Sequence, residues 1–193
     1  MSNLFNKIIF LMVCTSLWGC RSPLEKISSI TLTDFFNKEI YLAEISAHKA
    51  TVIAFLSPEC PLSENYTKTL NDIQLEFEEK DVDFINMFPG TLYSGEEIQT
   101  FIQTYQLKQN NLPDKKLMLA KYLKATTTPE VFVLNNKGEV VYSGAIDNWA
   151  IDLGEKRQVI TEFYLKDALN ALLQNKKIAV KKTTAVGCFI EGV

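Results

Sequence analysis

The chain has 193 residues and a formal net charge of −3, values that fit a single domain. Hydrophobic residues make up 47% of the chain and charged residues 22%, the balance of a globular protein with a sizeable core. The negative charge gives no electrostatic reason to expect nucleic acid or an anionic membrane surface as a partner. No long apolar run follows the N-terminal one, so no further membrane span is expected.

The N-terminus has the pattern of a bacterial targeting segment. Lys7 supplies a positive charge, an apolar run covers residues 8–14, and Leu17-Trp18-Gly19-Cys20 follows. The run is short for a membrane span and favours a signal peptide. Its ending resembles a lipobox, which implies a lipid on Cys20 and a protein anchored in the bacterial cell envelope, facing the periplasm or at the outer membrane. An uncleaved anchor or a signal without lipid is the alternative.

This interpretation divides the chain into four parts. Residues 1–19 would be the signal peptide and residues 20–29 a short lipidated tether. Residues 30–176 would form the single domain, and residues 177–193 a C-terminal tail that carries Cys188.

The first half of the domain alternates between strand and helix patterns. Residues 30–32 and 39–42 predict a small hairpin, and residues 51–56 form the continuous apolar run that is typical of a strand buried on both faces. Apolar residues at helical spacing predict a helix over 62–80, and a strand is expected over 82–87.

The second half adds two helices, a hairpin and a last helix. Ser94 and Glu97 form a capping-box pattern for a helix over 95–105, and another helix is expected over 114–122. The turn residues 135–138 predict a hairpin between strands 131–134 and 139–142. A final helix over 163–174 precedes a partly β-like tail. Early βαβ units and a late antiparallel hairpin predict an α/β fold with a mixed sheet and helices on both faces.

Cys60 stands where the apolar strand ends and the next helix begins. The unpaired N–H groups and the dipole at a helix N-terminus stabilise a thiolate. The like charges of Glu59 and Glu64 would act in the opposite direction. Farther along the chain, Pro129 follows Thr128 directly before a buried strand, a context in which a cis peptide bond is expected.

The cysteine count points to chemistry or to one bridge. Of four cysteines, Cys14 would leave with the signal peptide and Cys20 would carry the lipid. Cys60 and Cys188 remain, in a compartment that permits disulfides. Two cysteines are too few to form a disulfide scaffold for a domain of this size.

With these features the chain resembles the thioredoxin-like superfamily and, within it, the redoxin group of alkyl hydroperoxide reductase and thiol-specific antioxidant relatives. The resemblance covers about residues 30–174 and implies a three-layer α/β/α sandwich with a mixed central sheet. More narrowly, the chain is similar to exported bacterial redoxin-domain proteins. The shared motifs are Ser57-Pro58-Glu59-Cys60-Pro61-Leu62-Ser63, Ile146-Asp147-Asn148, Asp152-Leu153-Gly154 and Gly187-Cys188.

The resemblance implies an envelope thiol–disulfide oxidoreductase or a peroxiredoxin-like antioxidant, acting on a protein thiol or disulfide or on a small peroxide. Cys60 would be the nucleophile, and Cys188 would be the thiol that resolves its oxidised form. The substrate groove would be formed by Pro129, Thr128, Ser57 and Ser63. No cofactor is expected.

Two departures from the family pattern narrow this expectation. Ser63 replaces the second cysteine of a Cys-x-x-Cys motif, so the usual internal disulfide cannot form. Ile53 stands where a peroxiredoxin would carry the proline of its active-site loop, whereas Ser57 is a tolerable substitute for the threonine of that loop. Both departures favour exchange with a protein partner over fast peroxide reduction.

Other functions remain open. The chain could be a non-catalytic binding module with a structural Cys60–Cys188 disulfide, or a metal- or haem-handling protein with two cysteine ligands. His48, the single histidine, is expected in a loop and not at a metal.

The segment that contains Asp147, Asp152, Lys156 and Arg157 is expected to be a solvated connection. Alternatively, Arg157 lines the rim near Cys60 together with Trp149.

Overall fold

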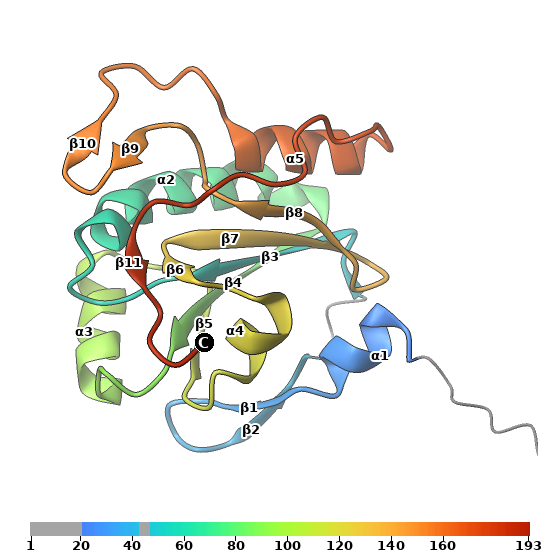
Figure 1. The fold of residues 1–193 in the computed structure, drawn as a ribbon. Helices are drawn as coiled ribbons and strands as arrows, with labels where there is room; N and C mark the ends of the chain where they lie inside the picture. Colours follow the sequence, from blue (N-terminus) through green and yellow to red (C-terminus); the bar gives the residue numbers. More distant parts are fainter. Residues whose placement is uncertain (1–20, 43–46) are drawn as a thin grey trace, which may run out of the picture.

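A computed structural model of the protein describes residues 21–42 and 47–193. Its centre is a five-stranded sheet between two layers of helices (Figure 1). The strands of this sheet are β3 (Ala50–Phe55), β4 (Val82–Pro89), β5 (Asn110–Asp114), β7 (Glu130–Asn135) and β8 (Val140–Gly144). The helices are α1 (Pro23–Ser28), α2 (Pro61–Phe77), the 3₁₀ turn η2 (Glu78–Lys80), α3 (Gly95–Thr104), α4 (Met118–Leu123) and α5 (Tyr164–Leu173).

The sheet has the order β5-β4-β3-β7-β8 and is mixed. β4 is parallel to both β3 and β5, whereas β7 is antiparallel to both β3 and β8. Three two-stranded pairs lie outside it: β1 (Thr31–Thr33) with β2 (Glu39–Tyr41), β6 (Thr127–Thr128) with β11 (Cys188–Phe189), and β9 (Ala150–Asp152) with β10 (Glu155–Lys156). The predicted three-layer α/β/α sandwich with a mixed central sheet is confirmed.

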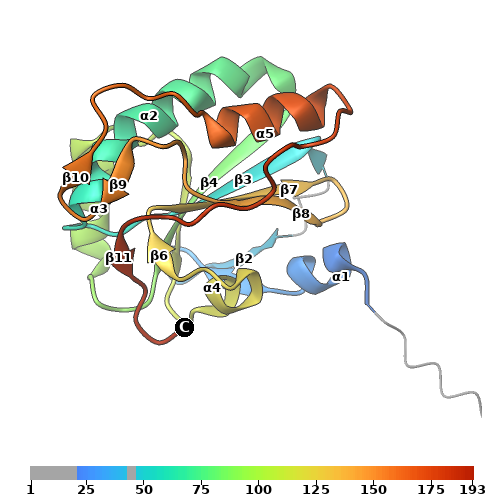
Figure 2. The ribbon, with the colours of Figure 1, turned by 45° about the horizontal axis from the view of Figure 1, so that its top comes forward.

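The two faces of the sheet carry separate apolar clusters. On one face Val52 and Ala54 of β3 pack with side chains of α2, α3 and α5. On the other face Ile53 and Phe55 pack with side chains of α1, α4 and the β1–β2 pair (Figure 2). Burial on both faces explains the continuous apolar run of β3, because alternate side chains point to opposite faces.

The N-terminal boundary of the domain differs from the prediction. Residues 20–29 were expected to be a tether, yet Ser22 caps helix α1 in a capping box with Glu25. Ile27 of this helix is fully buried in the core. Cys20 and the signal peptide expected over residues 1–19 lie outside the described residues. None of the described helices has both the length and the apolar character that a membrane crossing requires.

Strand β5 and the start of α4 also differ from the prediction. A helix was expected from Asp114, but Asp114 ends β5 and the helix begins at Met118. The polar sequence of β5 obscures it, because its side chains are held by tertiary hydrogen bonds: the Asn86 amide of β4 donates to Asn111 Oδ1 at 3.0 Å. The Asp114 carboxylate then accepts hydrogen bonds from three backbone N–H groups of α4.

The C-terminal tail runs beside β8, the edge strand of the central sheet, before it reaches β6. Backbone hydrogen bonds join Lys181 and Thr183 to Ser143 of β8, and the Thr183 hydroxyl accepts from the Ala145 N–H at 2.9 Å. The chain then runs to β11, which lies beside β6 (Figure 1). Ile190, just after β11, is 8% exposed and joins the second apolar cluster.

Candidate functional site: a thiol pair built from a strand–helix junction and the C-terminal tail

Cys60 lies at the junction of β3 and α2, as predicted. It occupies the position before the first turn of α2, with Pro61 as the first helical residue. The residue before it, Glu59, has a left-handed backbone with φ 58°, which turns the chain from the strand into the helix. Cys60 is 2% exposed. The nucleophile candidate is therefore held in the framework of the domain and is shielded from solvent.

The loop before β7 faces Cys60. The Thr128–Pro129 peptide bond is cis, which confirms the prediction for this bond. The Cys60 thiol donates a hydrogen bond to the Thr128 carbonyl at 3.1 Å, across 68 positions of sequence. The Glu130 carboxylate stabilises the conformation of this loop, because it accepts a hydrogen bond from the Thr126 N–H at 2.8 Å.

The tail brings Cys188 to the same place. β11 is antiparallel to β6, and Cys188 pairs with Thr128 in the register. Both cysteines are free thiols, and both meet at Thr128: the Cys60 thiol donates to its carbonyl oxygen, and Cys188 is its partner in the strand pair. The two candidate thiols of the sequence are thus brought to the same residue, although 128 positions separate them in the chain.

Gly187 explains why the Gly-Cys motif pairs so closely with β6. A Cβ atom built on Gly187 would lie 2.0 Å from the Thr128 carbonyl oxygen and 2.7 Å from its carbon. Any other residue would have to push β11 away from β6. The glycine therefore lets the tail approach the loop that faces Cys60, and it belongs to the site although it carries no side chain.

The two thiols have opposite acid–base character. Burial raises the pKa of Cys60, but hydrogen bonds from the Cys188 thiol and from the N–H and hydroxyl of Ser63 outweigh it, so this pKa lies below its ordinary value. Burial, the hydrogen bond to Cys60 and the negative charge of its thiolate raise the pKa of Cys188 to about 11. Hydrogen bonds, and not the charges of Glu59 and Glu64, set the direction at Cys60. The pKa of Cys60 therefore lies below that of Cys188, so Cys60 is the thiol of the pair that ionises first.

Ser63 does not line a groove, contrary to the prediction. It is fully buried, and its hydroxyl accepts a hydrogen bond from the Ser57 N–H at 3.2 Å. Hydrogen bonding by the Ser63 N–H and hydroxyl lowers the pKa of Cys60. Residue 63 is one helical turn beyond Cys60, so the serine at the position of the missing second cysteine favours ionisation of the Cys60 thiol.

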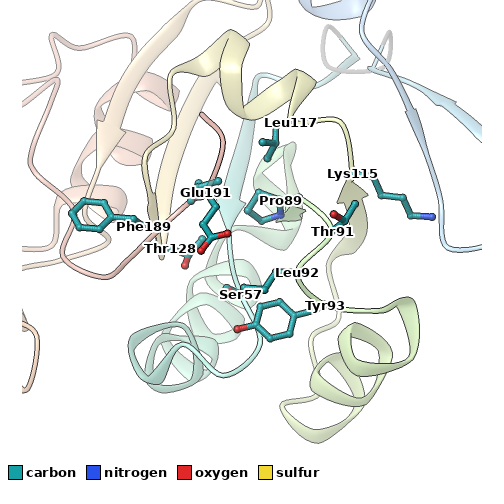
Figure 3. Close-up of a pocket in the computed structure, with 12 residues that line it drawn as sticks. Ser57, Pro89, Thr91, Leu92, Tyr93, Lys115, Leu117, Thr128, Phe189 and Glu191 are labelled. Atoms are coloured by element: carbon teal, nitrogen blue, oxygen red, sulfur yellow. The ribbon is translucent and has the colours of Figure 1, made fainter.

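A cavity of about 490 Å³ opens beside the thiol pair. Ser57 and Thr128, two of the predicted groove residues, line it, and Pro129 is buried outside it. Figure 3 shows that Leu117 and Glu191 also border this space, whereas the Phe189 ring lies to one side. The remaining lining comes from the segment after β4, residues 89–93, from Lys115 and from Ile190.

The charged segment after β8 separates into a buried anchor and an exposed loop. Asp147 is only 4% exposed, and its carboxylate accepts hydrogen bonds from the Tyr66 hydroxyl at 2.6 Å and from the Trp149 N–H at 2.8 Å. Burial, together with this hydrogen bond and charge, raises the pKa of Tyr66. Trp149 packs edge-on against Tyr66 of α2, with ring centroids 5.4 Å apart.

The other charged residues of this segment, Asp152, Lys156 and Arg157, are exposed, as expected of a solvated connection. The motif around Asp147 therefore anchors the loop to the helix that starts at Cys60.

His48 is far from this chemistry. It precedes β3, whereas Cys60 follows the other end of that strand, and its Nδ1 lies 3.1 Å from Asp81 Oδ1. Within residues 21–42 and 47–193, no group of three or more His, Cys, Asp or Glu side chains is arranged to hold a metal ion.

The sequence patterns missed the pairing of β6 with β11. Both strands have only two residues, too short for a periodic signal. The available signal was the Gly187-Cys188 motif itself, because a glycine beside a cysteine in a β-like segment indicates a close approach of two backbones.

Comparisons with known proteins agree with this architecture. A sequence profile of the AhpC/TSA family matches residues 23–143. No curated protein matches the chain.

Similar folds occur in several solved structures. A hypothetical protein from Sinorhizobium meliloti superposes with a TM-score of 0.73 at 21% identity, covering 85% of this chain and 91% of the other. An uncharacterized conserved protein from Geobacillus kaustophilus gives 0.73 at 22% identity, with 85% and 88% covered. A secreted disulfide oxidoreductase of Mycobacterium tuberculosis, described as homologous to DsbE of Escherichia coli, gives 0.55 at 16% identity, with 78% and 98% covered.

At these identities the structural likeness establishes the fold, which is thioredoxin-like. The family follows from the sequence profile, which extends from helix α1 to strand β8 and covers more than half of the chain. The chain belongs to the AhpC/TSA family.

Proposed function

We propose that the protein is a thiol–disulfide oxidoreductase in which Cys60 is the nucleophile and Cys188 the resolving thiol. One observation carries the proposal: two free thiols meet at Thr128, whose carbonyl accepts a hydrogen bond from Cys60 and whose partner in the strand pair is Cys188. The pKa of Cys60 is lowered and that of Cys188 is raised, which supports these two roles. A reactive cysteine needs thiolate character, and its partner must remain protonated until the second step.

In the first step the Cys60 thiolate attacks one sulfur of a substrate disulfide. The substrate S–S bond breaks, a mixed disulfide forms with Cys60, and the departing substrate sulfur takes up a proton. The Ser63 N–H and hydroxyl stabilise the thiolate before attack.

In the second step Cys188 loses its proton and attacks the Cys60 sulfur of the mixed disulfide. A Cys60–Cys188 bond forms, and the second substrate sulfur leaves as a thiol. Two electrons have then passed from the dithiol to the substrate, and an external thiol reductant restores the pair. The reverse sequence oxidises a substrate dithiol.

Exchange is favoured over peroxide reduction by Ile53. This residue stands where the family's peroxidase loop carries its proline, and in this chain it is a fully buried residue of β3, paired with Ile85 and Phe132. A regular strand at this position replaces the loop on which peroxide binding in the family depends.

The proposal extends to location. The lipobox-like ending at Cys20 supports a lipid anchor in the cell envelope, where disulfide exchange has substrates. A secreted oxidoreductase among proteins of similar fold is consistent with this location. Mass spectrometry of the protein isolated from membranes would detect the lipid, and a Cys20→Ser variant should lose it.

The proposed function is tested by measuring the reduction of insulin disulfides by the protein, with an external thiol as the reductant. Cys60→Ser should abolish it, because the hydroxyl cannot attack a disulfide. Thermal denaturation of the same variant should show an intact fold, since the replacement is nearly isosteric. Full activity of the folded variant would contradict the proposal.

The alternative function, a binding module with a permanent Cys60–Cys188 bridge, predicts a different result. Its disulfide would survive millimolar dithiothreitol without denaturant, whereas a catalytic pair would be reduced under these conditions. Mass spectrometry after alkylation distinguishes the two states.

A further inference from the structure

The tail lies between two cavities at β6. One, of about 490 Å³, is lined by Thr128, Phe189 and Ile190 on its tail side. The other, of about 550 Å³, is lined by Thr127, Gly187 and Phe189. Phe189 borders both, so β11 is the partition between them. Without β11 the two spaces would join into one groove along β6, next to Cys60.

The tail that fills this place is held by few contacts. Two residue pairs join β11 to β6, and the Phe189 side chain is 86% exposed. One more backbone hydrogen bond follows, from the Ile190 N–H to the Thr126 carbonyl at 2.9 Å, and the Thr128 hydroxyl donates to the Cys188 carbonyl at 3.4 Å. Ile190 is its one buried apolar anchor, and Glu191 and Val193 are exposed. By contrast, Thr183 is fixed to β8 by backbone and side-chain hydrogen bonds. The segment after Thr183 can therefore leave β6 while the chain keeps it nearby.

Access to Cys60 requires such a departure. Cys60 is 2% exposed, and the partners around its sulfur are the Thr128 carbonyl, Ser63 and the tail residue Cys188. The first two belong to the framework of the domain. Only the tail can move away without disrupting the central sheet, and its departure leaves the backbone of Thr127 and Thr128 without its partner strand.

From these observations we infer that the chain's own segment Gly187–Ile190 is an internal ligand of β6, which an extended polypeptide with a cysteine disulfide must displace to reach Cys60. This inference rests on the proposed function and names the regulation of that site. A substrate segment would pair with β6 in place of β11 and would bring its half-cystine to the position of Cys188. The return of β11 then delivers the resolving thiol and expels the product.

The contact at Gly187 sets a preference among such substrates. Because a Cβ atom at this position would lie 2.0 Å from the Thr128 carbonyl oxygen, a segment with glycine directly before its half-cystine fits β6 best. A β-branched residue there would hold the two backbones apart.

Peptide binding tests the inference without any redox chemistry. The probe is a fluorescent synthetic peptide with the sequence of residues 184–193 and serine in place of Cys188. Two full-length proteins are compared by fluorescence anisotropy: Cys188→Ser, and Cys188→Ser combined with Gly187→Val. The second substitution should displace the internal segment, so the probe should bind about tenfold tighter, as expected if the groove is free in about a tenth of the Cys188→Ser molecules.

Two controls keep the result interpretable. A probe with valine at the Gly187 position should bind neither protein. Ile190→Asp in the Cys188→Ser protein removes the apolar anchor by a different route and should also tighten binding of the original probe. Equal, weak binding by all three proteins would overturn the inference. Insulin reduction by the wild-type protein would still stand in that case, so the failure of the inference is distinguishable from failure of the proposed function.

The substrate preference has its own measurement. Peptides that carry Gly-Cys or Val-Cys, each with the cysteine activated as a thionitrobenzoate disulfide, are mixed with the Gly187→Val, Cys188→Ser protein. Attack by Cys60 forms the peptide–Cys60 disulfide and releases thionitrobenzoate, whose absorbance gives the rate. The Gly-Cys peptide should react faster. Equal rates would contradict the assignment of β6 as the docking strand.

Discussion

The two cysteines of the site are held in opposite ways. Cys60 follows a strand that is buried on both faces and starts a helix of 17 residues that packs on the core. Cys188 sits in a two-residue strand at the end of the chain, beside a phenylalanine that is 86% exposed. The difference suggests a division of labour, in which a fixed nucleophile keeps its geometry while a lightly held partner arrives and leaves. Each of the following predictions tests this contrast.

The largest expected effect is on stability. Leu70 of α2 is 1% exposed in the core, and Leu70→Ala should lower the free energy of unfolding by about 2–5 kcal/mol. Phe189→Ala in the tail is the matched control and should change it by less than about 0.5 kcal/mol. Urea unfolding measures both. A large loss from Phe189→Ala would show that the tail is part of the cooperative core.

The next effect is on turnover. Cys188→Ala should still allow the first attack by Cys60 but slow steady-state insulin reduction by about 100-fold, because an external thiol must replace one that the fold holds beside the mixed disulfide. Mass spectrometry should find the mixed disulfide accumulating on Cys60. Unchanged turnover would mean that Cys188 has no resolving role.

A smaller effect concerns the support of α2. Tyr66→Phe removes a buried hydrogen bond to the Asp147 carboxylate and should destabilise the protein by about 1.5–3 kcal/mol. Tyr41→Phe removes a similar bond of 2.7 Å to Glu39 on the surface and should cost less than about 1 kcal/mol. Thermal denaturation compares the pair. Equal losses would argue against a special role of the buried loop anchor.

The last effect is a shift along the pH axis. The Cys188 thiol lowers the pKa of Cys60 by donating a hydrogen bond to its sulfur, so loss of the donor should raise that pKa. The rate of Cys60 alkylation by iodoacetamide increases with pH as the thiol ionises. The midpoint of this increase should therefore lie at a higher pH in Cys188→Ala than in Cys188→Ser, whose hydroxyl still donates a hydrogen bond. Coincident profiles for the two variants would remove Cys188 from the stabilisation of the thiolate.

The elements that could be predicted from the sequence follow the same division between a fixed core and a lightly held tail. Strong local patterns predicted β3, α2 and the β7–β8 hairpin, because burial on both faces, helical spacing and turn residues each leave a mark within a few positions. Strand β5 was missed, since its polar side chains are held by Asn86 of a neighbouring strand.

The site shows this limit more sharply. The place of Cys60 could be predicted from the residues around it. The cysteine count suggested Cys188 as its partner, but no pattern near either cysteine encodes how the tail reaches Thr128 over so many positions. The groove position expected for Ser63 was wrong: only the fold shows that this residue is fully buried and that its hydroxyl accepts a hydrogen bond from the Ser57 N–H.

The distance in sequence between the two thiols has a consequence for how the protein is made. A dithiol within one helical turn is complete as soon as that helix forms, whereas this pair awaits the last strand of the chain. Since synthesis proceeds from the N-terminus, Cys60 emerges long before its partner exists. A chain interrupted anywhere before Cys188 would keep a reactive thiol and lose the means to release what it captures. Under the proposed function, the segment around Cys188 thus decides whether the molecule acts as a catalyst or as a trap.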